Sequence, residues 1–446
     1  MMVWLLGCIG SDNPVTVVPN RPGGVLNHHI EVGCGEVREL SGSLELTDPI
    51  TWCDQGYNAV RGDLTLLTQQ PDLSSLSCLC SVGGELTLSG DMLSLAGMEN
   101  LERVGGLTIE DAPTIVDLKP LAGVEIEGDV ELVTMRLLAS VEGLDGPVIY
   151  GDLVLLTESI ALRDLSGLGA TEVHGDLDIG WTPGLASLTG LESITRVGGD
   201  LSVQGNHGLL DLQGLEVETI DGTLRVSNNA LLESLEGLDG LTHVHGWMFV
   251  QGNPLLVDLR GLGALVQVDR ALQVDQNASM SSLAGMEQLS WIGGNLELLY
   301  LAELTTLDTL PPLQVEGIVQ IKDNKKLKDL DGLDGLVQVR SVRLHDNDAL
   351  VSVAGLAGLE RATGYVVISD NDVLQTLGGL ESLSEIGGDL RIEDNDALVD
   401  VTALHQTQRV GGNLKVLDNV ALTDDAAWAL VEAVGSVEGQ VLVGGN

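Results

Sequence analysis

The chain has 446 residues, with 66 acidic against 21 basic side chains and a formal net charge of −45. A surface this acidic is repelled by nucleic-acid phosphates and anionic lipid headgroups, so we expect neither as a direct partner. Mean hydropathy is positive, at +0.22, yet the longest apolar runs stay below the roughly 18 residues of a membrane-spanning helix.

Residues 1–8 are short and apolar and end in Leu5-Leu6-Gly7-Cys8. This ending resembles the signal of bacterial lipoproteins, which implies lipid attachment at Cys8. No basic residue precedes the apolar stretch, so an ordinary N-terminus with a chance match stays open. Residues 9–30 carry three prolines and no repeat, which is typical of an extended tether. We therefore expect an outward-facing lipoprotein of the bacterial outer membrane, or a secreted protein, whose contact with a membrane is made only by that lipid.

Residues 31–59 are expected to form an N-terminal cap, because the repeats described below begin only after them. The cysteines near this end are Cys34, Cys53, Cys78 and Cys80. Four cysteines allow three disulfide pairings. We favour Cys34 with Cys53, which would close the open end of the first coil and leave Cys78 and Cys80 as a tight loop or reduced. A zinc site is the alternative, although the paired two-residue gaps of common zinc sites are absent.

Residues 60–420 repeat a pattern every 22 to 24 residues. In the unit that starts at Val173, Leu177 and Ile179 alternate with polar residues, which predicts a strand with one buried face. Leucine or isoleucine then recurs at every third position, at residues 185, 188, 191 and 194. One short strand per unit predicts a stacked solenoid, since a single unit cannot bury its own apolar face.

The ten residues Val197-Gly-Gly-Asp-Leu-Ser-Val-Gln-Gly-Asn206 are a representative copy of the repeat. Their pattern resembles the leucine-rich repeat, and more closely the repeat of receptor L-domains. The resemblance implies a mainly β, right-handed parallel solenoid of about 16–17 coils that carries a binding surface. We expect no cofactor, with calcium on the acidic strip described below as the alternative. Glycine pairs such as Gly198-Gly199 are expected where the chain bends into each strand.

Asparagine recurs nine residues after the start of ten units. Such a column predicts a ladder of side-chain amides that pair with the backbone of adjacent coils, which we take as structural. Its members are Asn206, Asn229, Asn253, Asn277, Asn324, Asn347, Asn371, Asn395, Asn419 and Asn446.

Residues 421–446 depart from the repeat spacing. Thr423 is a suitable helix N-cap ahead of two aspartates. Trp428, Val431 and Val434 follow at three-residue spacing. This pattern predicts a short helix that uses these three side chains to cap the last coils.

Asp129, Asp152, Asp176 and Asp200 occupy the same outward position in four successive coils. Stacked like charges repel unless water, salt or a cation screens them. A solvated acidic face is one interpretation, and a calcium-binding strip is the second. The third is an enzyme, since carboxylates on neighbouring coils serve as acid and base in β-helix polysaccharide hydrolases and lyases. Because the repeat shows no long insertions that could wall a cleft, we expect no enzyme.

Two groups of outward side chains are candidates for contact with a ligand. The first is an aromatic pair beside a basic residue, and the second is a basic and aromatic group near the C-terminus. Both could instead be structural, the first by packing on loops and the second by neutralising Asp346, Asp370 and Asp394. The candidates are Trp247, Phe249 and Arg225 in the first group and Arg343, Tyr365, Arg391 and Lys415 in the second.

Taken together, these patterns predict a non-catalytic, monomeric repeat protein that binds a protein or a glycan through its exposed parallel sheet. The alternatives are a polysaccharide-active enzyme that uses the acidic strip, and a structural adhesion component.

Overall fold

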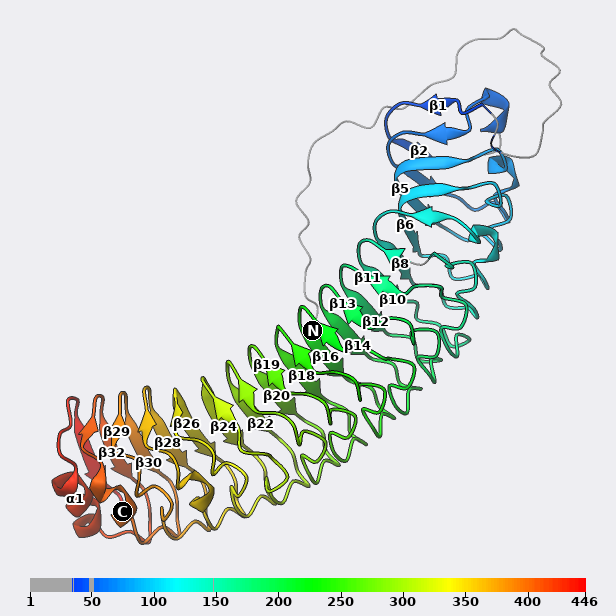
Figure 1. Ribbon diagram of the computed structural model, residues 1–446. Coiled ribbons are helices and arrows are strands. Elements are labelled where there is room, and N and C mark those ends of the chain that lie inside the picture. The colour runs from blue at the N-terminus through cyan, green and yellow to red at the C-terminus, as the bar shows by residue number, and fades with distance from the viewer. Residues whose placement is uncertain (1–33, 35, 48–51, 147) are drawn as a thin grey trace.

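The computed structural model describes residues 34, 36–47, 52–146 and 148–446. These residues form one elongated, curved stack of coils, with the N-terminal coils at one end and helix α1 at the other (Figure 1). The predictions for residues 1–8 and 9–30, including lipid attachment at Cys8, lie outside the described residues.

One parallel sheet runs along the concave side of the curve, and irregular turns form the convex side (Figure 1). Each coil contributes one main strand, which pairs in register with the strand of the next coil. This arrangement confirms the prediction of a mainly β parallel solenoid. The main strands are β2 (Leu44–Leu46), β4 (Leu64–Leu67), β5 (Ser81–Ser89), β6 (Arg103–Glu110), β8 (Val130–Val133), β10 (Leu153–Leu156), β12 (Leu177–Gly180), β14 (Leu201–Gln204), β16 (Leu224–Ser227), β18 (Met248–Gln251), β20 (Leu272–Asp275), β22 (Leu296–Leu299), β24 (Ile318–Lys322), β26 (Ser341–His345), β28 (Val366–Ser369), β30 (Leu390–Glu393), β32 (Leu414–Leu417) and β33 (Val441–Gly444).

Two-residue strands precede most main strands. The first three, β1, β3 and β7, pair within the main sheet, the eight from β9 to β23 form a second parallel sheet, and the four from β25 to β31 form a third. They are β1 (Glu39–Leu40), β3 (Ala59–Val60), β7 (Glu125–Ile126), β9 (Val148–Ile149), β11 (Glu172–Val173), β13 (Arg196–Val197), β15 (Thr219–Ile220), β17 (His243–Val244), β19 (Gln267–Val268), β21 (Trp291–Ile292), β23 (Gln314–Val315), β25 (Gln338–Val339), β27 (Arg361–Ala362), β29 (Glu385–Ile386) and β31 (Arg409–Val410). Single 3-10 turns occur at Cys53–Gln55, Ser74–Leu76, Lys119–Leu121, Ala354–Leu356 and Thr402–Gln406.

The core is one continuous column of aliphatic side chains that runs through all the coils. In the unit that starts at Val173, Leu177 and Ile179 of β12 are fully buried while Asp178 between them faces outward. The leucines at every third position of the following arc are fully buried too. Buried side chains at every second position therefore form the strand, and buried side chains at every third position let the rest of the coil turn around the same core.

The N-terminal coils are tied by two disulfides, Cys34–Cys80 and Cys53–Cys78, with Cα–Cα distances of 5.8 and 5.7 Å. The predicted Cys34–Cys53 pair is therefore wrong. Stacking places residues side by side when they are whole coils apart, and the two bridges span 46 and 25 residues. Cys34 and Cys53 are 19 positions apart, which is less than the 20-residue offset between the paired strands β2 and β4 and less than the 22 to 24 residues of the regular coils.

Helix α1 (Asp424–Ala433) closes the C-terminal end, and the Thr423 side chain accepts a hydrogen bond from the Ala426 N–H as an N-cap. The predicted contact face is wrong in one residue: Trp428 is exposed, whereas Ala427 and Leu430 are buried. The helix therefore packs one residue further round than the three-residue spacing indicated. Among the described residues, no helix has the length and apolar character needed to cross a bilayer.

Candidate functional site

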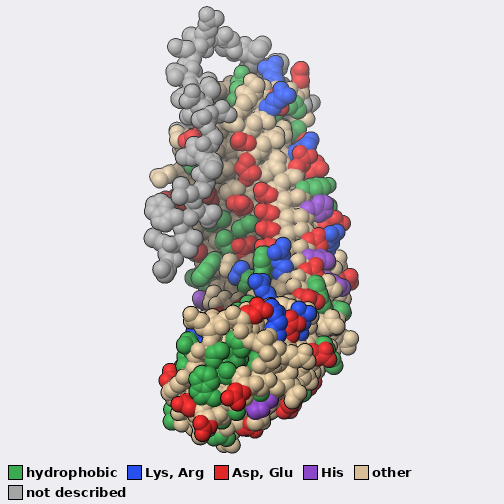
Figure 2. All heavy atoms as spheres, turned by 90° about the vertical axis from the view of Figure 1, so that its left-hand side faces the viewer, with side chains coloured by type: hydrophobic (Ala, Val, Ile, Leu, Met, Phe, Trp, Pro, Cys, Tyr) green, Lys and Arg blue, Asp and Glu red, His purple; other side chains and the backbone are tan. Residues whose placement is uncertain are grey.

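Acidic side chains gather in rows along the face of the solenoid that Figure 2 shows. The four aspartates of the acidic strip are bound to the backbone of the next coil. Oδ1 of Asp129 accepts the Asp152 N–H at 2.8 Å, and Oδ1 of Asp152 accepts the Asp176 N–H at 2.7 Å. Asp176 and Asp200 repeat the contact to the N–H groups of Asp200 and Thr223, both at 2.7 Å. Each carboxylate thus caps a backbone donor, and Oδ2 alone is left for a cation. The calcium interpretation of this strip stays a prediction.

The glycine before each of these hydrogen bonds makes room for the carboxylate. A Cβ on Gly175 would lie 2.1 Å from Oδ1 of Asp152, and one on Gly199 would lie 2.0 Å from Oδ1 of Asp176. Neither glycine has a left-handed φ. Close approach between coils, and not the bend of the chain, is therefore what requires glycine here.

Asp178 lies on the same face, one coil away from Ser202, and its Oδ1 is buried without a hydrogen-bond partner. Burial raises the pKa of its carboxyl group above the usual value, and Asp176 adds to the shift, while the neighbouring polar side chains of Ser202 and Gln204 and the charge of Arg225 oppose it. Burial likewise raises the pKa of Glu131, with further repulsion from nearby carboxylates.

We expect Asp178→Asn to stabilise the protein at pH 7.5. A carboxyl group whose pKa is raised on folding stabilises the fold only while protonated, so wild-type stability falls as the pH rises through the folded-state pKa. The asparagine side chain does not ionise, so the variant should have the higher free energy of unfolding at pH 7.5. This difference from the wild type should vanish below about pH 4, near the ordinary aspartate pKa. Urea denaturation at pH 7.5 and below pH 4 measures the free energy of unfolding of both proteins. The exposed Glu216→Gln is the control, and an equal gain at both pH values would contradict the explanation.

The aromatic candidates lie in the middle of the concave sheet, where arginines cover both rings. The Arg225 guanidinium lies 4.6 Å from the centre of the Phe249 ring, in register on the neighbouring strand. Arg270, which the sequence did not single out, lies 4.5 Å from the Trp247 ring. Trp247 remains 42% exposed. These cation–π contacts use the ring faces within the protein, which leaves less aromatic surface for a partner.

The basic candidates come together further along the same face, over β26, β28 and β30. Arg343, Val367 and Arg391 are neighbours in register. They line a groove of ≈ 620 Å³ together with Tyr365, which precedes β28. Lys415 is the next residue in register after Arg391 but is not part of the groove lining. The structure therefore brings together three of the four C-terminal candidates, which occupy a different part of the sheet from Trp247.

The groove is mixed in charge. Arg391 donates to Oδ2 of Asp389 at 2.6 and 3.2 Å, and this hydrogen bonding holds the pKa of Asp389 below its usual value. The Nε atom of Arg343 is buried without a hydrogen-bond partner, and none of the ion pairs among the described residues includes Arg343. Four carboxylates also line the groove, from Asp370, Asp389, Glu393 and Asp394. Of the two arginines, only Arg343 is thus free to meet a ligand, and it would do so in surroundings that are acidic overall.

No family model matches the sequence, and no curated protein matches it either. Among solved structures, the crystal structure of the TLR13–ssRNA13 complex is similar over 85% of this chain and 91% of that chain, with 12% identity and a TM-score of 0.17. A likeness this weak says nothing about the ligand. The parallel coils, their aliphatic core and the repeated strand nevertheless make this chain a leucine-rich-repeat-like solenoid.

Proposed function

We propose that this solenoid is a non-catalytic binding protein, displayed on a bacterial cell surface or secreted, that holds a glycan or protein ligand against its concave sheet. The contact site is the groove over β26, β28 and β30. The observation that carries the proposal is the unpaired Arg343 guanidinium beside the half-buried Tyr365 in that groove. Arg343 is half-buried and belongs to no ion pair among the described residues, so the accessible part of its guanidinium group can donate to a ligand acceptor.

The groove also suits a ligand with many hydroxyl or amide groups better than a highly charged one. Its carboxylates accept hydrogen bonds, its guanidinium groups donate them, and the Tyr365 ring and Val367 offer an apolar surface. Binding sites commonly combine an apolar floor with a few well-placed polar groups in this way. The acidic lining argues against a polyanion.

We expect Arg343→Ala with Tyr365→Ala to weaken binding by at least about tenfold, or roughly 1.4 kcal/mol, because central arginine and tyrosine side chains often dominate an interface. Glycan arrays and envelope-protein pull-downs with the full chain identify the ligand, and calorimetry measures its Kd. Arg225→Ala with Phe249→Ala is the matched control, since it removes an arginine–aromatic pair from the same sheet.

Loss of binding in the control alone would move the contact site to the middle of the sheet. If neither double variant loses affinity for a ligand of the wild-type chain, the concave sheet is not the binding surface. Loss in the Arg343 and Tyr365 variant, with a normal circular dichroism spectrum, supports the proposed groove.

A further inference from the structure

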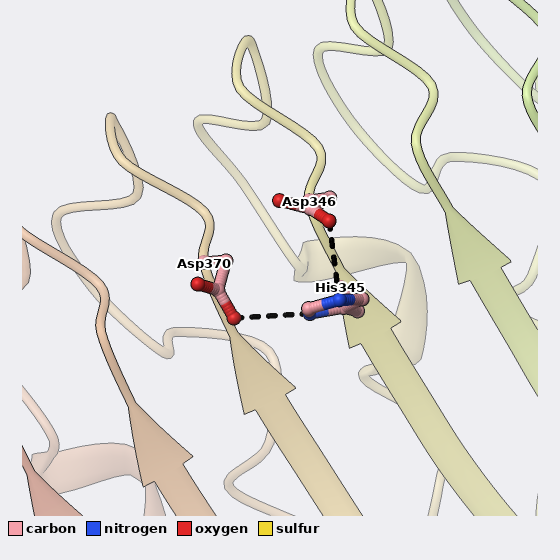
Figure 3. Close-up of side chains that lie close together, drawn as sticks. All are labelled: His345, Asp346 and Asp370. Carbon is pink, nitrogen blue, oxygen red and sulfur yellow. Dashed lines mark ion pairs between the residues drawn. The ribbon is translucent and has the colours of Figure 1, made fainter.

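At the edge of this groove, one imidazole lies between two carboxylates of adjacent coils (Figure 3). Nε2 of His345 lies 3.1 Å from Oδ2 of Asp346, and its Nδ1 lies 3.0 Å from Oδ2 of Asp370. Each of the three residues offers one ligand atom within 4.8 Å of the others. Among the described residues, this is the one set of three histidine, cysteine or carboxylate side chains that meets that distance.

The backbone fixes the positions of these side chains. Asp346 and Asp370 both adopt left-handed φ values, 59° and 56°, directly before the ladder residues Asn347 and Asn371. The Asn347 N–H donates to Oδ1 of Asn371 at 3.2 Å, which locks the two turns together. His345 ends β26, where Ser369 of β28 lies in register with it. The two carboxylates contact different ring nitrogens, and Nδ1 also lies 2.9 Å from Oγ of Ser369, so one carboxylate must turn toward the nitrogen that binds the ion.

The surroundings favour a cation. The left-handed aspartates continue along the stack as Asp394 and Asp418. Burial and repulsion from Asp370, Asp418 and Asp396 raise the pKa of Asp394. Lys325 is the competing positive charge, but its Nζ lies 3.9 Å from Oδ1 of Asp346 and closer, 3.0 Å, to Asp348. It can therefore keep its Asp348 contact when Asp346 turns to a metal.

We propose that His345, Asp346 and Asp370 form a binding site for a divalent transition metal ion such as Zn²⁺. An imidazole nitrogen with two carboxylate oxygens is a donor set suited to zinc, cobalt or nickel, whereas calcium prefers six to eight oxygen ligands. All three side chains are only half-buried. A coordination position would therefore remain open to water or to a donor from a molecule in the groove.

Two other histidines on the same solenoid provide internal controls. His245 pairs with a single carboxylate, Asp269, with Nδ1 to Oδ2 at 2.8 Å, and stacks on the His243 ring at 6.0 Å. His174 pairs with one carboxylate, Glu172, at 3.1 Å, and packs edge-on against the Tyr150 ring. One imidazole with one carboxylate is a poor chelate. Metal affinity should therefore distinguish His345 from both of them.

The test is calorimetric titration of the full chain with Zn²⁺, repeated with Co²⁺ and followed by visible absorption. The background carries His28→Ala and His29→Ala, so that these two adjacent imidazoles do not add binding. We expect one site per chain whose affinity falls at least tenfold in His345→Ala and in Asp370→Asn, while His245→Ala leaves it unchanged.

Circular dichroism and urea denaturation must show that the variants remain folded. A conservative variant, His345→Gln, keeps a polar side chain of similar reach, and it should lose the site as well. Unchanged affinity and stoichiometry in folded His345→Ala would overturn the proposal, as would the absence of binding at micromolar Zn²⁺ in the unsubstituted site. Because the titration contains no glycan or protein ligand, its result is independent of the proposed function.

Discussion

Gly261→Ala is expected to destabilise the protein by at least about 3 kcal/mol, because a strained backbone and a steric clash occur together. Gly261 has a φ of 108°, where a side chain is disfavoured in any surroundings. A Cβ there would also lie 2.1 Å from the Leu235 carbonyl oxygen of the preceding coil. That oxygen belongs to the backbone, so relief of the clash requires the two coils to separate.

Gly263→Ala is the matched control, two residues away in the same convex turn. A Cβ at Gly263 would have no neighbour within 4 Å, and its φ is outside the left-handed region. We expect a change below about 0.5 kcal/mol, or slight stabilisation through the unfolded state. Urea denaturation gives the midpoints, and hydrogen exchange around residues 235 and 261 reports local separation of the coils. Equal midpoints for the two variants would show that the turn adapts to a side chain without cost.

Those features of the fold that follow from periodicity could be predicted from the sequence. The positions of Leu177 and Ile179, and the arc of leucines after them, depend only on which side chains must be buried. The asparagine column was visible as well, and its amides do bind neighbouring coils. The local sequence pattern is sufficient to predict these positions, because every coil buries its apolar side chains against its neighbours in the same way.

Contacts between coils were harder to predict, because they depend on which residues stacking makes neighbours. The disulfides illustrate this, since a rule of whole-coil separations would have selected Cys53 with Cys78. The Arg270 contact with Trp247 was missed for the same reason. His345 and Asp370 are likewise about one coil apart in sequence and meet only in the stack.

The residue before each ladder asparagine is a further repeated position, which is recognisable in the sequence by its recurring aspartate. It adopts a left-handed conformation along the stack, with φ values of 54° to 59° from residue 276 to residue 418. Aspartate occupies the position in five successive coils, at residues 323, 346, 370, 394 and 418. Aspartate tolerates this conformation better than most residues. The backbone requirement of the ladder thus also produces the acidic column that supplies Asp346 and Asp370.

The ladder itself yields the second large effect: Asn253→Ala should cost about 2–4 kcal/mol, because several buried polar groups lose partners at once. Oδ1 of Asn253 accepts the Asn229 backbone N–H at 3.0 Å, and its Nδ2 donates to the Val226 carbonyl at 3.0 Å. The side chain is fully buried. Water cannot replace these bonds unless the coils open, so the loss should appear in the urea midpoint and as faster exchange of the Asn229 amide.

Asn100→Ala is the control, since Asn100 is only half-buried and its side chain makes one hydrogen bond, to the Ser77 carbonyl. We expect it to cost less than about 1 kcal/mol. The natural break in the ladder at Leu301 shows what a coil keeps without the amide: its N–H still donates to Oδ1 of Asn324 at 2.9 Å, but its side chain offers no acceptor to the preceding coil. If Asn253→Ala cost no more than Asn100→Ala, the aliphatic core alone would hold the coils together, and the amide column would contribute register without stability.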